Sequence, residues 1–100
     1  MTTLTSARKR YLRSLAHALK PIVTIGKNGV TDGVRAELDN ALEISELLKI
    51  KFTDFKEEKE TLTADLAASS GAALVGMIGH IAILYRTHPE PEKRKIEFPK

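Results

Sequence analysis

A four-residue segment with glycine at both ends, Gly26-Lys27-Asn28-Gly29, separates two stretches of different hydrophobic periodicity. The β-branched run at 22–25 predicts a short buried strand, because such side chains pack well on a pleated surface. The stretch from Thr31 onward predicts a helix, because its apolar residues recur at a spacing of about 3.6. The chain therefore changes from strand to helix across a short turn, which indicates a fold that contains both.

The glycine-framed segment has a composition suited to phosphate. Glycine permits a positive φ and lets another backbone come close. The first N–H groups of the following helix lack intrahelical partners and carry the positive end of the helix dipole. Lys27 can neutralise a phosphate there, and Asn28 can adopt a left-handed conformation or bond to a phosphate or sugar. Nucleic acid is the simplest such polyanion, with an ordinary strand-to-helix turn as the alternative interpretation.

The length of 100 residues predicts one domain over 1–100, with a core at about 4–87 and a basic tail at 88–100. The chain has no cysteine, which excludes a disulfide scaffold and any thiolate metal site. No apolar run approaches the roughly 20 residues of a membrane span, and the first residues of the sequence lack the apolar h-region that is typical of a signal peptide. We expect a cytoplasmic monomer without membrane contact. The net charge of +3 is modest, so its distribution matters more than its size.

The patterns along the chain predict an α+β fold of the order α-β-α-β-α-β-β. Helices are expected at about 6–18, 31–44 and 55–69, and strands at about 22–25, 47–52, 73–78 and 81–86. Gly79-His80 predicts a hairpin between the last two strands. The expected architecture is a small two-layer sandwich with one four-stranded mixed sheet. The segment 96–98 is either a short edge strand or a tail laid on the body.

The first predicted helix is amphipathic, and the polar side is uniformly basic. That side, called the basic face below, comprises Lys9, Arg10, Arg13, His17 and Lys20, within an arc of about 100° on a helical projection. No acidic residue occurs in the first 31 residues. We expect the basic face to lie beside the glycine loop and to continue it as one stripe for a phosphate backbone. A merely solvated helix face is the alternative.

The other polar residues give weaker indications. Arg86, Lys93, Arg94 and Lys95 are secondary candidates for contact with nucleic acid, whereas solvation is favoured for Lys49 and Lys51. The three histidines lack metal-ligand spacing, and no nucleophile has a base and an orienting acid nearby in sequence. We therefore expect no catalysis, no metal, no cofactor and no small-molecule substrate.

Four blocks of the chain, in order, resemble the signature blocks of the CRM (CRS1–YhbY) RNA-binding domain. They are Leu15-Ala16-His17-Ala18-Leu19-Lys20-Pro21, Ile25-Gly26-Lys27-Asn28-Gly29-Val30-Thr31, Glu46-Leu47-Leu48-Lys49-Ile50-Lys51, and the ending from Ile78-Gly79-His80 to Leu84-Tyr85-Arg86. The resemblance extends over about 4–98, and the short length is similar to the stand-alone bacterial YhbY-like members. Val30 in place of a commoner leucine, Ser45 in place of a frequent histidine and an insertion at 89–92 are mild departures.

The resemblance implies a fold related to the C-terminal domain of bacterial initiation factor three. It implies RNA binding through the loop of Gly26, Lys27, Asn28 and Gly29 and the neighbouring basic surface. Bacterial members of the family associate with precursors of the large ribosomal subunit, so ribosomal RNA is the expected partner. A protein-binding adapter, using the acidic outer faces of the second and third helices with only incidental RNA contact, is the alternative function.

Overall fold

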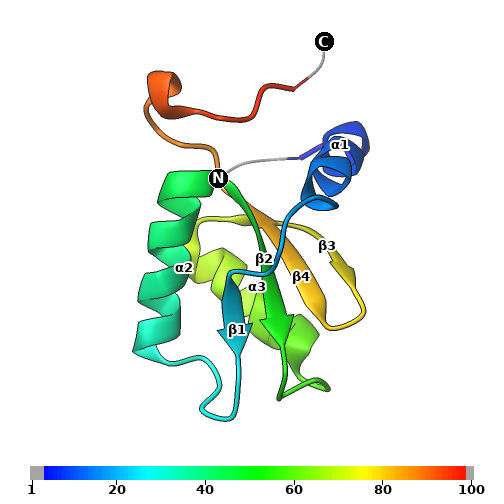
Figure 1. Cartoon of the computed structure of the whole chain (residues 1–100), viewed down its shortest axis with the longest axis vertical. Coiled ribbons are helices and arrows are strands. Elements are labelled where there is room, and N and C mark those ends of the chain that lie inside the picture. Colours follow the sequence, from blue (N-terminus) through cyan, green and yellow to red (C-terminus); the bar gives the residue numbers. More distant parts are fainter. Residues whose placement is uncertain (1–3, 99–100) are drawn as a thin grey trace.

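The computed structural model describes residues 4–98, which form three α-helices, a four-stranded sheet and a short 3₁₀ helix (Figure 1). In chain order the elements are α1 (Ser6–Ala16), β1 (Val23–Ile25), α2 (Asp32–Ser45), β2 (Leu47–Phe52), α3 (Lys59–Ser70), β3 (Ala73–Ile78), β4 (Ile81–Tyr85) and η1 (Pro91–Lys93). This order confirms the predicted α+β class. Within the described residues, no helix has both the length and the apolar character that crossing a membrane requires.

The sheet is mixed, with the strand order β1-β2-β4-β3. β1 pairs in parallel with β2, placing Thr24 beside Lys51, and α2 makes the crossover that a parallel connection requires. β2 and β3 each pair antiparallel with β4, and β3 carries a bulge between Leu74 and Gly76. The predicted four-stranded mixed sheet and the Gly79-His80 hairpin are both confirmed.

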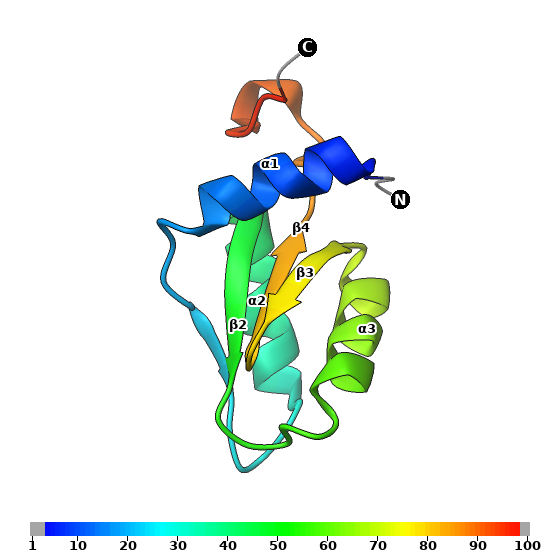
Figure 2. The same cartoon turned by 90° about the vertical axis from the view of Figure 1, so that its right-hand side faces the viewer.

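The two faces of the sheet are covered to different extents (Figure 2). α2 and α3 cover one face over a large core that includes Val23, Ile25, Leu38, Leu42, Leu48, Ile50, Phe52, Leu66 and Leu84. α1 and the C-terminal segment cover only one end of the other face, over a smaller core of Leu12, Ala16, Leu47, Val75, Ile83 and Tyr85. The expected two layers therefore describe the sheet with α2 and α3, and α1 adds a partial third layer.

Two helix boundaries differ from the predicted ones. α1 ends at Ala16 rather than about residue 18, because the chain tightens into a turn in which the Leu19 N–H donates to the Ala16 carbonyl at 2.9 Å. α3 begins at Lys59 rather than near residue 55. Phe55 has a φ of 55°, which is outside the helical range, so the helix cannot include it.

The C-terminal segment is held on the body by the buried side chain of Glu46 rather than by a strand. The Glu46 carboxylate accepts hydrogen bonds from the backbone N–H groups of His88 at 2.7 Å, Lys95 at 2.6 Å and Ile96 at 3.0 Å. Ile96 and Phe98 then pack against the smaller core. Of the two arrangements considered for 96–98, the tail laid on the body is the observed one.

Candidate functional site

The loop of Gly26, Lys27, Asn28 and Gly29 is a β-turn that directly follows β1, at the end of the molecule opposite to the C-terminal segment (Figure 1). The Gly29 N–H donates to the Gly26 carbonyl at 2.9 Å, which closes the turn. Lys27 and Asn28 occupy its corner and are exposed. Within residues 4–98 their backbone N–H groups donate to no other backbone group, so both can bind an anion.

Two constraints at position 29 disfavour any residue with a Cβ atom. Its φ is 68°, a left-handed value that glycine adopts without steric cost. A Cβ atom at this position would also lie 3.3 Å from Cε2 of Phe55, closer than most real contacts. The left-handed residue of the turn is therefore Gly29, and the left-handed conformation considered for Asn28 is wrong, since Asn28 has no positive φ.

The segment 53–58 supports the loop from the side. The N–H groups of Thr53 and Asp54 donate to the Ile25 carbonyl at 3.0 and 3.3 Å, and the Thr53 hydroxyl donates to the same oxygen at 3.2 Å. Phe55 places its ring against Gly29. These contacts hold the carbonyl immediately before the turn, so the turn is supported by the protein's own hydrogen bonds.

The N-terminus of α2 contributes less to an anion site than the sequence predicted. The Thr31 hydroxyl accepts a hydrogen bond from the Val34 N–H at 3.1 Å and caps the helix. Asp32 in the first turn already places negative charge there. An approaching phosphate would therefore be bound chiefly by the turn's own N–H groups and Lys27.

The basic face of α1 projects beyond the part of the sheet that the helix covers. Arg10, Arg13, His17 and Lys20 are exposed, whereas Lys9 is half-buried because it lies near the inward stripe of the helix. The Arg13 side chain crosses β3 at Gly76, where an added Cβ would lie 3.2 Å from Arg13 Cδ. Gly76 thus lets the arginine stem lie directly on the sheet.

The expected adjacency of the basic face and the glycine loop is wrong, because the two lie at opposite ends of β1 (Figures 1 and 2). About 20 Å of extended chain separates Lys20 from Gly26, at roughly 3.3 Å per residue. Two lysines of β2 occupy the interval. Since Leu48, Ile50 and Phe52 point toward α2 and α3, Lys49 and Lys51 point to the α1 side.

Lys49 and Lys51 are therefore basic residues of the same surface as α1, although the sequence favoured simple solvation for both. Lys51 is exposed, while Lys49 is half-buried and donates through Nζ to the Leu19 carbonyl at 3.1 Å. Their alternation with apolar residues was visible in the sequence. The missing information was that α1 covers only one end of their face.

The secondary basic candidates lie away from the loop, and three of them make defined structural contacts. The Arg86 guanidinium pairs with Asp39 at 2.6 Å and Glu43 at 3.3 Å and is only 17% exposed. Lys93 pairs with Glu90 at 2.9 Å, and Arg94 Nε donates to the His88 carbonyl at 2.8 Å. These contacts give Arg86 a structural role, and we leave it out of the proposed RNA surface.

The candidate cations differ from Arg86 and Lys93 in having no carboxylate partner among the described residues. Within residues 4–98, no ion pair involves the basic face of α1, Lys27, Lys49 or Lys51. All four ion pairs there involve Arg86, His88 or Lys93. The positive charge on the α1 side of the sheet is thus not neutralised by the protein itself.

Lys59, at the start of α3, places its positive charge against the Gly79-His80 hairpin tip. Lys59 Nζ donates to the Gly79 carbonyl at 2.6 Å and lies 3.2 Å from His80 Nδ1. Local desolvation, followed by the positive charges of Lys59 and Lys56, holds the pKa of His80 below its ordinary value of 6.5. Among the described residues, no three His, Cys, Asp or Glu side chains are grouped as a metal site.

Known proteins are similar to most or all of this chain. A family model described as the CRS1 / YhbY (CRM) domain matches residues 4–86. An "RNA-binding protein" of Haemophilus influenzae is 43% identical over 101 residues, covering 100% of this chain and 99% of the relative. A "Probable RNA-binding protein YqeI" of Bacillus subtilis is 38% identical, covering 96% and 99%. The solution structure of a hypothetical Staphylococcus aureus protein superposes with a TM-score of 0.78 at 34% identity, covering 95% of this chain and 100% of that one.

Proposed function

The chain belongs to the CRS1 / YhbY (CRM) domain family, and on that premise we propose that it binds RNA through the glycine loop and the basic α1 side of the sheet. The relatives named as RNA-binding proteins support RNA as the partner class. The single observation that carries the proposal is the set of cations without a carboxylate partner among residues 4–98, on one side of the sheet. Such charge is stabilised when a phosphate backbone replaces its counterions.

In the proposed mechanism, RNA phosphates are bound at both ends of one surface, at the glycine loop and at α1. At one end, the N–H groups of the exposed residues Lys27 and Asn28 and the Lys27 ammonium bind a phosphate closely, because within residues 4–98 those N–H groups donate to no other backbone group. At the other end, Arg10, Arg13, His17 and Lys20, with the half-buried Lys9 behind them, bind further phosphates. Lys51 lies in the interval. A surface of this kind recognises the path of the backbone more than the base sequence.

Base stacking is a minor contribution in this proposal. Phe55 is 42% exposed beside the loop, but Tyr11 and Phe98 pack against each other with ring centroids 5.9 Å apart. Tyr85 is buried. A stacking platform needs neighbouring exposed rings, and the described surface offers a single one near the loop.

We propose ribosomal RNA of the large-subunit precursor as the target, in ribosome assembly. The support is the resemblance to stand-alone bacterial YhbY-like proteins, whose family associates with such precursors. On this proposal the protein acts in the cytoplasm, as a monomer, by binding rather than by catalysis. Crosslinking in cells followed by sequencing of the bound RNA tests it: enrichment of large-subunit precursor RNA is expected, and enrichment of unrelated RNA alone would reject the ribosomal role.

A protein-binding adapter on ribosomal particles is the second candidate function. Glu37, Asp39 and Glu43 lie on the exposed side of α2, which is a poor surface for nucleic acid. One binding experiment with ribosomal particles distinguishes the two functions. RNA binding predicts that high salt or removal of accessible RNA releases the protein, whereas retention under both conditions would favour the adapter.

A further inference from the structure

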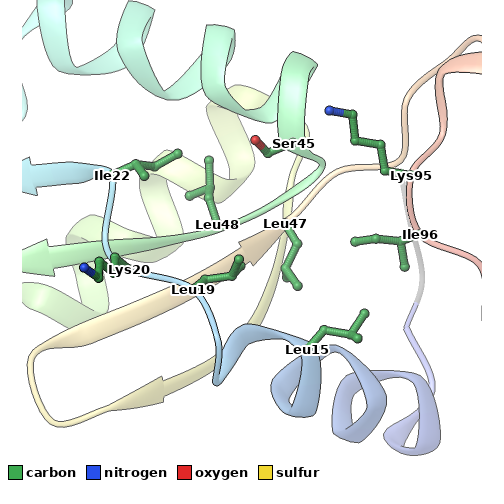
Figure 3. A pocket seen from close by; sticks show the side chains of 9 residues that line it. All are labelled: Leu15, Leu19, Lys20, Ile22, Ser45, Leu47, Leu48, Lys95 and Ile96. Atoms are coloured by element: carbon green, nitrogen blue, oxygen red, sulfur yellow. The ribbon is translucent and has the colours of Figure 1, made fainter.

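An apolar groove lies at the end of the molecule opposite to the glycine loop (Figure 3). Its apolar lining comes from the end of α1, the connection to β1, the start of β2 and the C-terminal segment: Leu15, Leu19, Ile22, Leu47, Leu48 and Ile96. Three of these side chains are well exposed, with Leu15 at 36%, Leu19 at 38% and Ile22 at 50%. Contiguous exposed aliphatic residues of this kind mark interaction surfaces on folded proteins.

The groove exists because the apolar pattern of the sequence continues beyond Ala16, where α1 ends. Leu19 would have continued the apolar stripe of a longer helix, but the turn after Ala16 brings it to the surface instead. On the opposite side, the tail anchored by Glu46 places Ile96 as a second wall. The groove is therefore built by two segments with defined hydrogen bonds.

The polar residues of the groove are positive. Lys20 and Lys95 extend from its opposite sides, and Ser45 is the remaining polar lining residue (Figure 3). Neither lysine forms an ion pair within residues 4–98. The nearby Glu46 carboxylate accepts three backbone hydrogen bonds in a buried position and does not lie among the lining residues. An apolar floor between two unpaired lysines is complementary to apolar side chains next to carboxylates.

We propose that this groove is a docking site for a protein segment that presents aliphatic or aromatic side chains flanked by Asp or Glu. The apolar side chains fill the groove over Leu19, Ile22 and Ile96, and the carboxylates pair with Lys20 and Lys95. A nucleobase fits the same place less well, because the lining holds no aromatic ring and no arginine on which a base could stack. Lys20 belongs both to this groove and to the basic face proposed above to bind RNA, whereas Leu19, Ile22, Lys95 and Ile96 belong to the groove alone.

The test is a titration of the nitrogen-15-labelled full chain, followed by NMR, with three defined probes. The first is a blocked peptide of about twelve residues, long enough for three helical turns, with leucine and glutamate on adjoining faces. The second carries lysine in place of glutamate, and the third is a uridine-rich oligonucleotide. The proposal predicts that the glutamate peptide shifts the amide signals of Leu19, Ile22 and Ile96 and that the lysine peptide shifts none of them. Because Lys20 is also on the basic face, Ile96 is the signal that discriminates the oligonucleotide, and it should not shift with that probe.

Two matched variants locate the binding. Ile22→Ser is expected to lower the affinity for the glutamate peptide about tenfold, because the half-exposed isoleucine side chain buries its remaining surface on binding. Ile78→Ser removes an isoleucine of similar exposure, 59%, at the hairpin on the other end and should have no effect. Charge reversal by Lys20→Glu/Lys95→Glu should exchange the preference, so that the lysine peptide binds instead.

Three results would overturn the proposal. One is an absence of shifts at glutamate-peptide concentrations up to about 1 mM, since a dissociation constant above that value would be too weak for specific docking. Another is equal weakening by Ile22→Ser and Ile78→Ser. The third is a shift of the Ile96 amide signal with the oligonucleotide and not with the glutamate peptide, which would assign the groove to RNA. Ribosomal RNA affinity should be the same for Ile22→Ser and the unmodified chain, so failure here leaves the RNA proposal intact.

Discussion

Gly29 lies against the ring of Phe55, and a Cβ atom at Gly29 would come within 3.3 Å of that ring. The contact joins the glycine loop to the segment before α3, and it occurs at a glycine whose φ is 68°. Loop shape and loop support therefore depend on the same residue.

Gly29→Ala should destabilise the protein more than Gly71→Ala. Both glycines have a left-handed φ, at 68° and 72°, so each alanine costs about 1–2 kcal/mol in backbone conformation. A Cβ at Gly71 meets nothing within 4 Å, which makes it the matched control. Chemical denaturation of both variants measures the difference, and Phe55→Leu in the Gly29→Ala background should reduce it. Equal losses for the two glycines would show that the Phe55 contact has no energetic consequence.

Glu46→Gln should loosen the C-terminal segment. In the unmodified chain backbone N–H groups donate to both carboxylate oxygens, and the glutamine amide replaces one of these oxygens with an NH₂ group that cannot accept from them. Leaving such a buried donor unsatisfied costs about 1–3 kcal/mol. Hydrogen exchange at the amides of His88, Lys95 and Ile96 should become faster, while Lys93→Gln, which breaks an exposed ion pair, should leave these amides protected. Unchanged protection in Glu46→Gln would contradict the role of this carboxylate.

Arg10→Glu/Arg13→Glu should lower RNA affinity without unfolding the protein, because both side chains are exposed on α1. If each arginine binds one phosphate, the slope of log affinity against log salt should fall by about two units. Lys93→Glu/Arg94→Glu changes the net charge equally in the tail and should have a smaller effect. Native circular dichroism together with native RNA affinity would mean that the basic face is only solvated.

The pKa of His80 should lie below 6.5 in an NMR titration, since local desolvation and the charges of Lys59 and Lys56 disfavour its protonation. Lys56→Gln should raise that pKa by removing one of these charges. Because the pKa in the folded state is the lower one, protonation of His80 favours the unfolded chain. Stability should therefore decline as the pH falls through the ordinary histidine pKa, and a pKa at or above 6.5 would contradict the positive surroundings.

The strands were predicted well where the local pattern had only one interpretation. The expected ranges 47–52 and 73–78 are those of β2 and β3, because alternating or continuous apolar residues ended at clear turn residues. The start of α3 was missed because Glu57 and Glu58 suit a first helical turn and a preceding loop equally well. The left-handed φ of Phe55, which ends that ambiguity, depends on packing against Gly29 and leaves no local signal.

The composition of the candidate site was easier to predict than its arrangement. Gly26, Lys27, Asn28 and Gly29 form an exposed turn next to a strand end, as the local sequence indicates. The place of α1 depends on tertiary packing, so the sequence did not reveal that Lys49 and Lys51 lie between the two basic regions. The structural role of Arg86 also required knowledge of contacts 47 and 43 residues away.

The proposed RNA contact of the glycine loop depends on one ammonium group, that of Lys27. The salt dependence of affinity for a large-subunit ribosomal RNA fragment, measured for the unmodified chain, Lys27→Ala and the ion-paired control Lys93→Ala, tests this contact. We expect weaker binding by Lys27→Ala and a slope lower by about one unit, with little change in the control. An unchanged affinity and slope for Lys27→Ala would contradict it.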